Sequence, residues 1–160
     1  MANHNNSCIL CRGAVADHEL QRVQVWEDTH WRLTTSLNAE VLGFSYLEPK
    51  RHITDISALG GDEARTLGVV LGRVTSALKA LSGAEFIYIY IFGDSIPHLH
   101  IHLAPHSDGD ALNSQMIRGE FESVVLESGA EQLISREFPP LPKAQQRAFA
   151  EQLQARLSER

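Results

Sequence analysis

Histidine and aliphatic residues alternate without interruption from position 98 to position 103, and this pattern constrains the fold more than any other part of the chain. Successive side chains of a β-strand point to opposite faces of the sheet. A strand here therefore places three imidazoles on one face, about 6–7 Å apart along the strand, and three aliphatic side chains on the other. The imidazoles belong to His98, His100 and His102. The segment predicts a sheet with one apolar face and one face that can carry chemistry.

Three clustered imidazoles indicate proton transfer or nucleophilic catalysis, because histidine titrates near neutral pH and its ring nitrogen is a competent nucleophile. Mutual repulsion disfavours the state in which all three are protonated, so at least one is expected to be neutral. One alternative is a polar or pH-sensitive strand face without catalysis. Another places all three rings on one metal ion. It is disfavoured because His98 and His102 lie about 13 Å apart on a regular strand.

The remaining pattern predicts a single α+β domain with an antiparallel sheet, because strands precede and follow one long helix. Apolar residues recur at three- and four-residue steps from Asp62 to Leu81, which predicts that amphipathic helix. A helical extension is expected over residues 143–160. The fourth strand fills both faces with aromatic and isoleucine side chains, which indicates a central strand. The predicted strands cover residues 23–26, 31–34, 41–47, 85–92 and 98–104.

Charge and cysteine content exclude several classes of protein. The 160 residues carry a formal net charge of -6, which argues against broad electrostatic binding to nucleic acid. No apolar run approaches the roughly 20 residues that span a bilayer, and residues 1–7 lack the basic head and apolar run of a signal peptide. Two cysteines cannot build a disulfide scaffold. These features predict a cytoplasmic protein with neither a membrane nor a nucleic-acid partner.

Cys8 and Cys11 form a Cys-x-x-Cys pair near the N-terminus. A thioredoxin-like redox motif should follow a strand, and residues 1–7 offer none. A zinc site needs two further nitrogen or sulfur ligands, which here must be histidines. His52, after the third predicted strand, and His98 are the candidates, and together the four would make a closed structural site. The alternative is two reduced, buried thiols.

These features together resemble the histidine triad (HIT) superfamily, whose signature alternates histidine with apolar residues as His98–Ala104 does here. The resemblance extends from Cys8 to about Pro105. It implies a HIT domain over residues 1–106 and leaves residues 107–160 as a C-terminal extension packed on the same domain. The other matching landmarks are Cys8–Cys11, Val25–Asp28, Gly43, Pro49–Ile53 and Gly93–Ser95.

The resemblance implies a nucleotide hydrolase, similar to diadenosine polyphosphate hydrolases, or a nucleotidyl transferase. His100 would attack the α-phosphorus and form a covalent nucleotidyl-histidine intermediate. His98 would orient it through its backbone carbonyl, and His102 and Ser95 would contact phosphate or leaving-group oxygens.

The same resemblance implies a structural zinc ion held by four residues, and a homodimer. Family members with the Cys-x-x-Cys pair bind zinc with that pair, with the histidine after the Pro-Lys turn and with the first histidine of the triad. These positions correspond to Cys8, Cys11, His52 and His98.

Three departures from the family pattern affect the expected substrate contacts, which otherwise include Ser95 and His102. Ser36 stands near the place of an acidic or amide residue that holds the ribose, Asp94 replaces a glutamine, and His106 replaces an arginine. Dinucleoside polyphosphates, nucleoside phosphoramidates and nucleotide sugars all remain open as substrates. Phosphorylase activity, or nucleotide binding without turnover, remains an alternative function.

Overall fold

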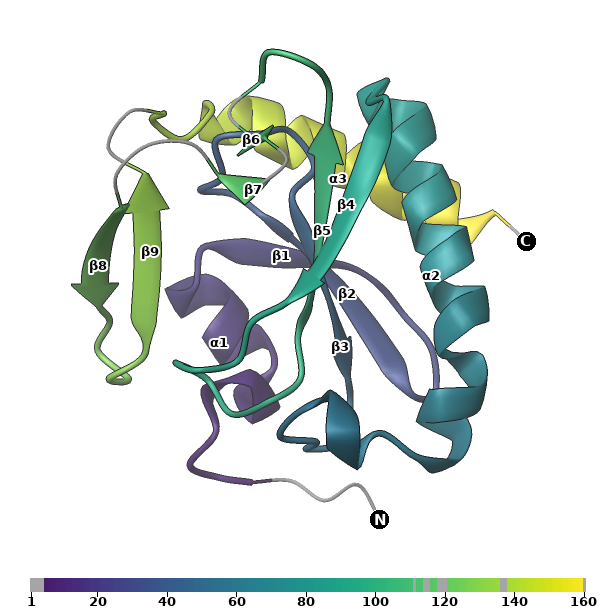
Figure 1. Cartoon of the computed structure of the whole chain (residues 1–160), viewed down its shortest axis with the longest axis vertical. Coiled ribbons are helices and arrows are strands. Elements are labelled where there is room, and N and C mark those ends of the chain that lie inside the picture. Colours follow the sequence, from purple (N-terminus) through teal and green to yellow (C-terminus); the bar gives the residue numbers. More distant parts are fainter. Residues whose placement is uncertain (1–4, 111, 114–115, 118–120, 136–137, 160) are drawn as a thin grey trace.

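The chain folds around a five-stranded antiparallel sheet with the spatial order β1-β2-β3-β5-β4 (Figure 1). This architecture comes from a computed structural model that describes residues 5–110, 112–113, 116–117, 121–135 and 138–159. The α+β prediction with an antiparallel sheet is confirmed. In spatial order the strands are β1 (Arg22–Glu27), β2 (Trp31–Ser36), β3 (Ser45–Pro49), β5 (Ile101–His106) and β4 (Phe86–Ile91).

Two helices, α2 (Gly61–Ser82) and α3 (Lys143–Ser158), supply the other half of the main core. The predicted amphipathic helix is confirmed as α2, which buries Val74 and Leu78 completely. From α3, Phe149 and Leu153 enter the same core. The core side chains from the sheet are Val25, Trp31, Leu33, Leu47, Ile101 and Leu103. Within the described residues, no helix is long and apolar enough to cross a membrane.

The opposite face of the sheet is aromatic and carries the functional cavity described below. Phe44 and Ala104 are buried there, with Tyr46, Tyr88 and Tyr90 packed against them. The alternation along residues 98–103 therefore separates a helix-covered apolar face from a face available for chemistry, as predicted.

Short elements surround this frame, and the two hairpins among them were not predicted. The segment 107–137 is polar and weakly patterned, yet it forms two small antiparallel hairpins. Figure 1 shows the larger one, β8–β9, beside α1 and apart from the main sheet. The short elements are η1 (Ile9–Arg12), α1 (Ala14–Glu19), η2 (Ile56–Ala58), β6 (Leu112–Asn113), β7 (Met116–Ile117), β8 (Phe121–Val125) and β9 (Glu131–Ser135).

The structure corrects the prediction that residues 85–92 form a central strand. β4 lies at the edge of the sheet, and Phe86 and Ile89 are 58% and 49% exposed. Apolar residues on both faces favour a strand covered on both sides, but the pattern does not say whether the cover comes from the same chain. The prediction was therefore right about the strand and wrong about its place.

Two predicted strand boundaries were also wrong, and both involve proline. β3 runs over Ser45–Pro49 instead of residues 41–47, and Pro49 is its last residue. β5 begins at Ile101, after two of the three histidines, and continues through Pro105. β5 pairs with β3 only over residues 101–103, so Pro105 lies beyond that ladder and is paired only with Ile87 of β4.

Candidate functional site

The histidine segment enters the sheet only at its end, and the segment before β5 is held by other contacts. The Leu99 amide donates to the Ile53 carbonyl at 2.7 Å, and Leu99 is 2% exposed. His100 and His102 line one cavity with their ring centroids 5.1 Å apart. His98 does not line this cavity; its ring lies beside the two cysteines. The prediction that all three imidazoles share one face of a strand is therefore wrong for His98, because β5 begins only at Ile101 and the His98 ring lies beside the cysteines.

A backbone hydrogen bond fixes the tautomer of His100. Its Nδ1 lies 2.6 Å from the carbonyl oxygen of His98, which can only accept, so Nδ1 carries the proton. The Nε2 of the neutral ring then keeps its lone pair. His100 is therefore oriented through the backbone contact with His98 that the family resemblance implied, with its proton on Nδ1.

His102 is enclosed by aromatic rings and is held neutral. Tyr90 stacks on it at 4.8 Å with an interplanar angle of 8°, and Phe44 and Tyr46 meet it edge-on. Its Nδ1 lies 3.3 Å from the Tyr90 carbonyl. Burial, with a smaller contribution from nearby His100, lowers the pKa of His102 to about 3. His102 is thus a rigid, uncharged wall of the site near neutral pH.

The cavity has a volume of about 470 Å³ and gathers most of the predicted substrate contacts. Ser36, at the end of β2, lines it, as do Asp94 and Ser95 from the loop before the histidines. His106 does not line it: its Nδ1 lies 2.9 Å from Asp110 and its ring stacks on Tyr88 at 4.5 Å. The structure brings together two of the three predicted catalytic histidines, His100 and His102, with Ser36 and the 94–95 loop, and leaves His106 outside the cavity.

Cys8, Cys11, His52 and His98 form a compact cluster, which we call the Cys2His2 cluster, and their ligand atoms all lie within 4.8 Å of one another. The Cys8 Sγ is 3.4 Å from the Nδ1 of His98, and the Cys11 Sγ is 3.5 Å from the Nδ1 of His52. Two thiols and two imidazole nitrogens are a donor set of structural zinc sites. The residues present therefore fit a zinc ion.

The second ring nitrogen of His98 supports this assignment. Its Nε2 lies 3.0 Å from the Pro49 carbonyl, so Nε2 carries the proton and the Nδ1 lone pair points toward the thiols. Burial lowers the pKa of His98, which keeps the ring neutral, and burial raises the pKa of the Cys11 thiol. Metal ligation is the chemistry that turns such buried thiols into thiolates.

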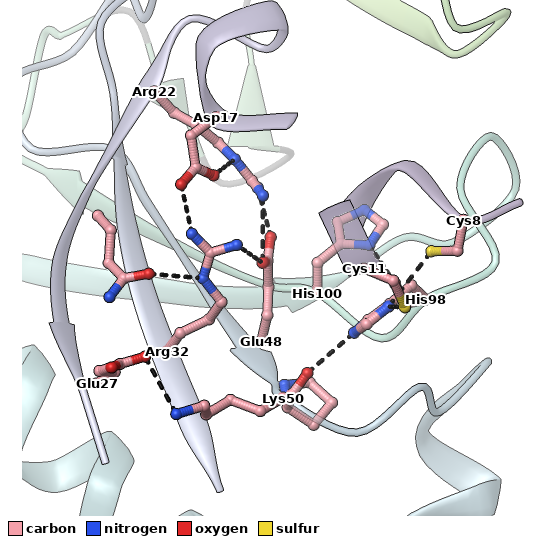
Figure 2. Close-up of polar contacts among 12 residues, drawn as sticks. Cys8, Cys11, Asp17, Arg22, Glu27, Arg32, Glu48, Lys50, His98 and His100 are labelled. Atoms are coloured by element: carbon pink, nitrogen blue, oxygen red, sulfur yellow. Dashed lines mark hydrogen bonds and ion pairs between the residues drawn. The ribbon is translucent and has the colours of Figure 1, made fainter. Parts of the chain in front are cut away.

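A buried charge network lies beside this cluster and was not predicted. It comprises Asp17, Arg22, Arg32 and Glu48, drawn in Figure 2. Arg22 bonds both carboxylates, with its Nε 2.9 Å from Asp17, and Glu48 is only 1% exposed. Arg32 is the cross-strand partner of Glu48 and also bonds Asp17. The strand register pairs Arg32 with Glu48, and contact between α1 and β1 adds Asp17 and Arg22, so no local pattern could have found all four residues.

The inner part of the cavity holds three more residues that were not predicted as site residues. Tyr46 and Tyr90 present phenol groups, and burial raises the pKa of Tyr46 to about 12 and also raises that of Tyr90. Glu40 also lines the cavity, and burial raises the pKa of its carboxyl group.

No family model matches the chain. Its sequence is similar to an uncharacterised HIT-like protein of Methanocaldococcus jannaschii, with 23% identity over 107 residues, which cover 64% of this chain and 81% of the relative.

Solved structures of histidine triad proteins match nearly the whole chain. A HIT-like protein involved in cell-cycle regulation from Bartonella henselae, solved with an unknown ligand, has a TM-score of 0.63 and 16% identity over 96% of this chain and 98% of its own. A hypothetical histidine triad nucleotide-binding protein from Sulfolobus tokodaii has a TM-score of 0.64 and 19% identity over 94% of this chain and 91% of its own. A zinc-bound histidine triad family protein from Mycobacterium smegmatis has a TM-score of 0.62 and 18% identity over 96% of this chain and 94% of its own. These likenesses show that the chain has the histidine triad fold.

Proposed function

We propose that this protein is a HIT-superfamily nucleotide hydrolase that cleaves a phosphoanhydride or phosphoramidate bond at the α-phosphate of a nucleotide. The observation that carries the proposal is the contact between His100 Nδ1 and the His98 carbonyl, which leaves Nε2 of a cavity-lining ring free to attack. The description of the Sulfolobus tokodaii relative as nucleotide-binding supports the choice of ligand.

The reaction proceeds in two displacements at phosphorus. First, the Nε2 lone pair of His100 forms a bond to the α-phosphorus, and the bond from phosphorus to the leaving group breaks with its electron pair. A proton from solvent neutralises the leaving group. Water then attacks the phosphorus and loses a proton to solvent, and the P–N bond breaks, which returns the lone pair to His100. The products are a nucleoside monophosphate and the protonated leaving group.

Two other cavity residues assist these steps. The Ser95 hydroxyl, on the loop before the histidines, donates a hydrogen bond to a phosphate or leaving-group oxygen. His102 shapes the phosphate site and packs against His100, and its enclosure by Tyr90 and Phe44 prevents the ring from turning away.

Zinc bound by Cys8, Cys11, His52 and His98 would be structural, because four protein ligands leave no open coordination position. Bound there, the metal supplies rigidity and no reacting group. His98 then serves twice: its ring is a ligand, and its backbone carbonyl orients His100. The Cys2His2 cluster thus positions the nucleophile without touching the substrate.

The experiment that tests the proposal is to trap the covalent intermediate. The protein is mixed with an adenosine 5′-phosphoramidate or a diadenosine polyphosphate, quenched with denaturant, and measured by intact mass and peptide mapping. We expect an added nucleoside monophosphate on His100. His100→Ala should lose turnover by at least about a thousandfold while its circular dichroism is unchanged.

The matched control is His18→Ala, which removes an exposed histidine of α1 and should keep full activity. An adduct on another residue, or turnover by His100→Ala near the wild-type rate, contradicts the proposal. With inorganic phosphate present, formation of a nucleoside diphosphate would identify the transferase alternative.

We also propose that two copies pair along β4 as a homodimer. An edge strand with exposed apolar side chains is a template for pairing with another chain. Phe86, Ile89 and Phe92 are 58%, 49% and 53% exposed along this edge. Sedimentation velocity should show twice the mass of the chain, and Ile89→Lys should shift the protein to monomer. A wild-type protein that is monomeric at micromolar concentration contradicts the pairing.

A further inference from the structure

The β8–β9 hairpin of the C-terminal extension is anchored at its turn end by three separate segments of the chain. Leu126 and Ala130 belong to an apolar cluster that also contains Leu10 of η1 and Ile96 of the loop before the histidines. The Ser128 amide donates to the Glu19 carboxylate of α1 at 2.8 Å. The hairpin is thereby fixed against both the segment between Cys8 and Cys11 and the loop that carries Ser95.

This anchoring brings the first residues of β9 to the cavity. Glu131 and Gln132 line the same cavity as His100 and His102. The Glu131 carboxylate accepts a hydrogen bond from Ser123 across the hairpin at 3.3 Å. A segment distant in sequence from the histidines therefore forms one wall of the site.

The charges around the cavity are unusual for a site that would hold several phosphates. Three acidic residues line it: Glu40, Asp94 and Glu131. Among the lining residues that the structure describes, Arg22 alone is a lysine or arginine, and its guanidinium is bonded to the carboxylates of Asp17 and Glu48. Each additional phosphate would bring negative charge toward carboxylates without gaining an unpaired cation.

We propose that Glu131 is a specificity-determining residue, which makes the site favour nucleotides with a single phosphate over those with a chain of phosphates. The inference rests on the proposed function, because it concerns the same cavity, and it narrows the substrate class to conjugates of a nucleoside monophosphate whose leaving group is not a polyphosphate. Glu131 acts by repulsion and takes no part in bond breaking.

The test measures binding, so that it is independent of turnover. Dissociation constants of AMP, ADP and ATP are determined by calorimetry for the wild-type protein, without magnesium and at low ionic strength. AMP should bind more tightly than ATP. In Glu131→Gln the affinity for ATP relative to AMP should rise about threefold, and in Glu131→Lys about tenfold, because removal or reversal of one screened charge has effects of this size.

The matched control is Glu127→Gln, which removes the same charge from the exposed turn of the same hairpin, away from the cavity lining. It should leave the ATP-to-AMP ratio unchanged. The shifts in the Glu131 variants should also shrink at about 1 M salt, since screening shortens the reach of a charge to roughly 3 Å. A structural role of Glu131 would not produce this salt dependence.

The outcomes separate the inference from the proposed function. Binding of AMP with the same ATP-to-AMP ratio in wild type, Glu131→Gln and Glu131→Lys overturns the inference and leaves the proposed function standing. Equal shifts in Glu127→Gln also overturn it, because the effect would then be one of net charge. Failure of all three nucleotides to bind the wild-type protein overturns the proposed function itself.

Discussion

The Cys2His2 cluster and the β8–β9 hairpin approach the cavity from different parts of the chain and are held by different kinds of contact. In the cluster, the ligand atoms of four side chains lie within 4.8 Å of one another, and His98 is hydrogen-bonded to the carbonyl of Pro49. The hairpin has two strands and is anchored by an apolar turn and one hydrogen bond to Glu19. Isolated two-stranded hairpins are marginally stable in water.

This difference separates the reaction from the choice of substrate. The proposed nucleophile receives its orientation from His98, which belongs to the tightly connected cluster. The carboxylate proposed to select the substrate, Glu131, belongs to the weakly connected hairpin. Changes in the hairpin can therefore alter specificity without disturbing the positioning of His100. The variants below test whether the two regions differ in stability as their contacts indicate.

Loss of a cysteine ligand should have the largest effect. Cys8→Ser removes one of the four proposed zinc ligands, and structural zinc sites contribute folding free energy directly. We expect one zinc per chain in the wild type, none in the variant, and a loss of at least about 5 kcal/mol in the free energy of unfolding. Metal analysis by mass spectrometry and chemical denaturation measure the two quantities.

The adjacent change Ser7→Ala is the control for Cys8→Ser, because Ser7 is exposed and lies outside the cluster. It should retain zinc and lose little stability. Retention of stoichiometric zinc by Cys8→Ser would contradict the assignment of Cys8 as a ligand.

The charge network beside the cluster should show the next largest effect. Glu48→Gln leaves Arg22 and Arg32 buried with one carboxylate between them, and breaking a buried pair typically costs 3–5 kcal/mol. We expect a loss of roughly 3 kcal/mol in urea denaturation. Glu27→Gln is the control, because Glu27 and Lys50 are 50% and 38% exposed, and such pairs contribute at most about 1 kcal/mol (Figure 2). Equal effects of the two variants would contradict the buried role of Glu48.

The two networks also show what the sequence can and cannot specify. Cys8, Cys11, His52 and His98 were candidates for one site because zinc accepts few ligand types and the chain has only two cysteines, and the family resemblance implied the same four residues. Arg32 and Glu48 carry no such chemical restriction. Their meeting depends on the register of β2 against β3, which a local pattern does not specify.

The same limit applies to the fold. The alternation at residues 98–103 correctly placed Leu99, Ile101 and Leu103 in the core, but it wrongly extended the strand, and its histidine face, back to His98. The edge position of β4 and the approach of Glu131 to the cavity depend on contacts between distant segments. The weak patterning of residues 107–137 predicted neither hairpin, since strands of two or five residues are too short to show a clear period.

Acid should lower the stability of the folded protein through His102, which forms part of the cavity wall. Its pKa is lowered to about 3 in the folded protein, against about 6.5 for an ordinary histidine. Between these values the unfolded chain binds a proton that the folded chain does not, so the free energy of unfolding decreases as pH falls. Compared with His102→Gln, the wild type should lose a few kcal/mol more between pH 7 and pH 4. Parallel curves from urea denaturation would show that His102 is not buried as described.

The smallest predicted effect is local and concerns the hydrogen bond that anchors the hairpin. Glu19→Ala removes the acceptor of the Ser128 amide, while alanine is compatible with α1. Amide hydrogen exchange in residues 121–135 should accelerate about fivefold, since loss of one such bond favours local opening. Exchange in β2 and β3 should stay unchanged, because those strands lie in the main sheet. The neighbouring variant His18→Ala should leave the hairpin at its wild-type rate. Faster exchange throughout the chain would mean that the hairpin opens only with the whole fold, and that its specificity role is not separable from the stability of the cluster.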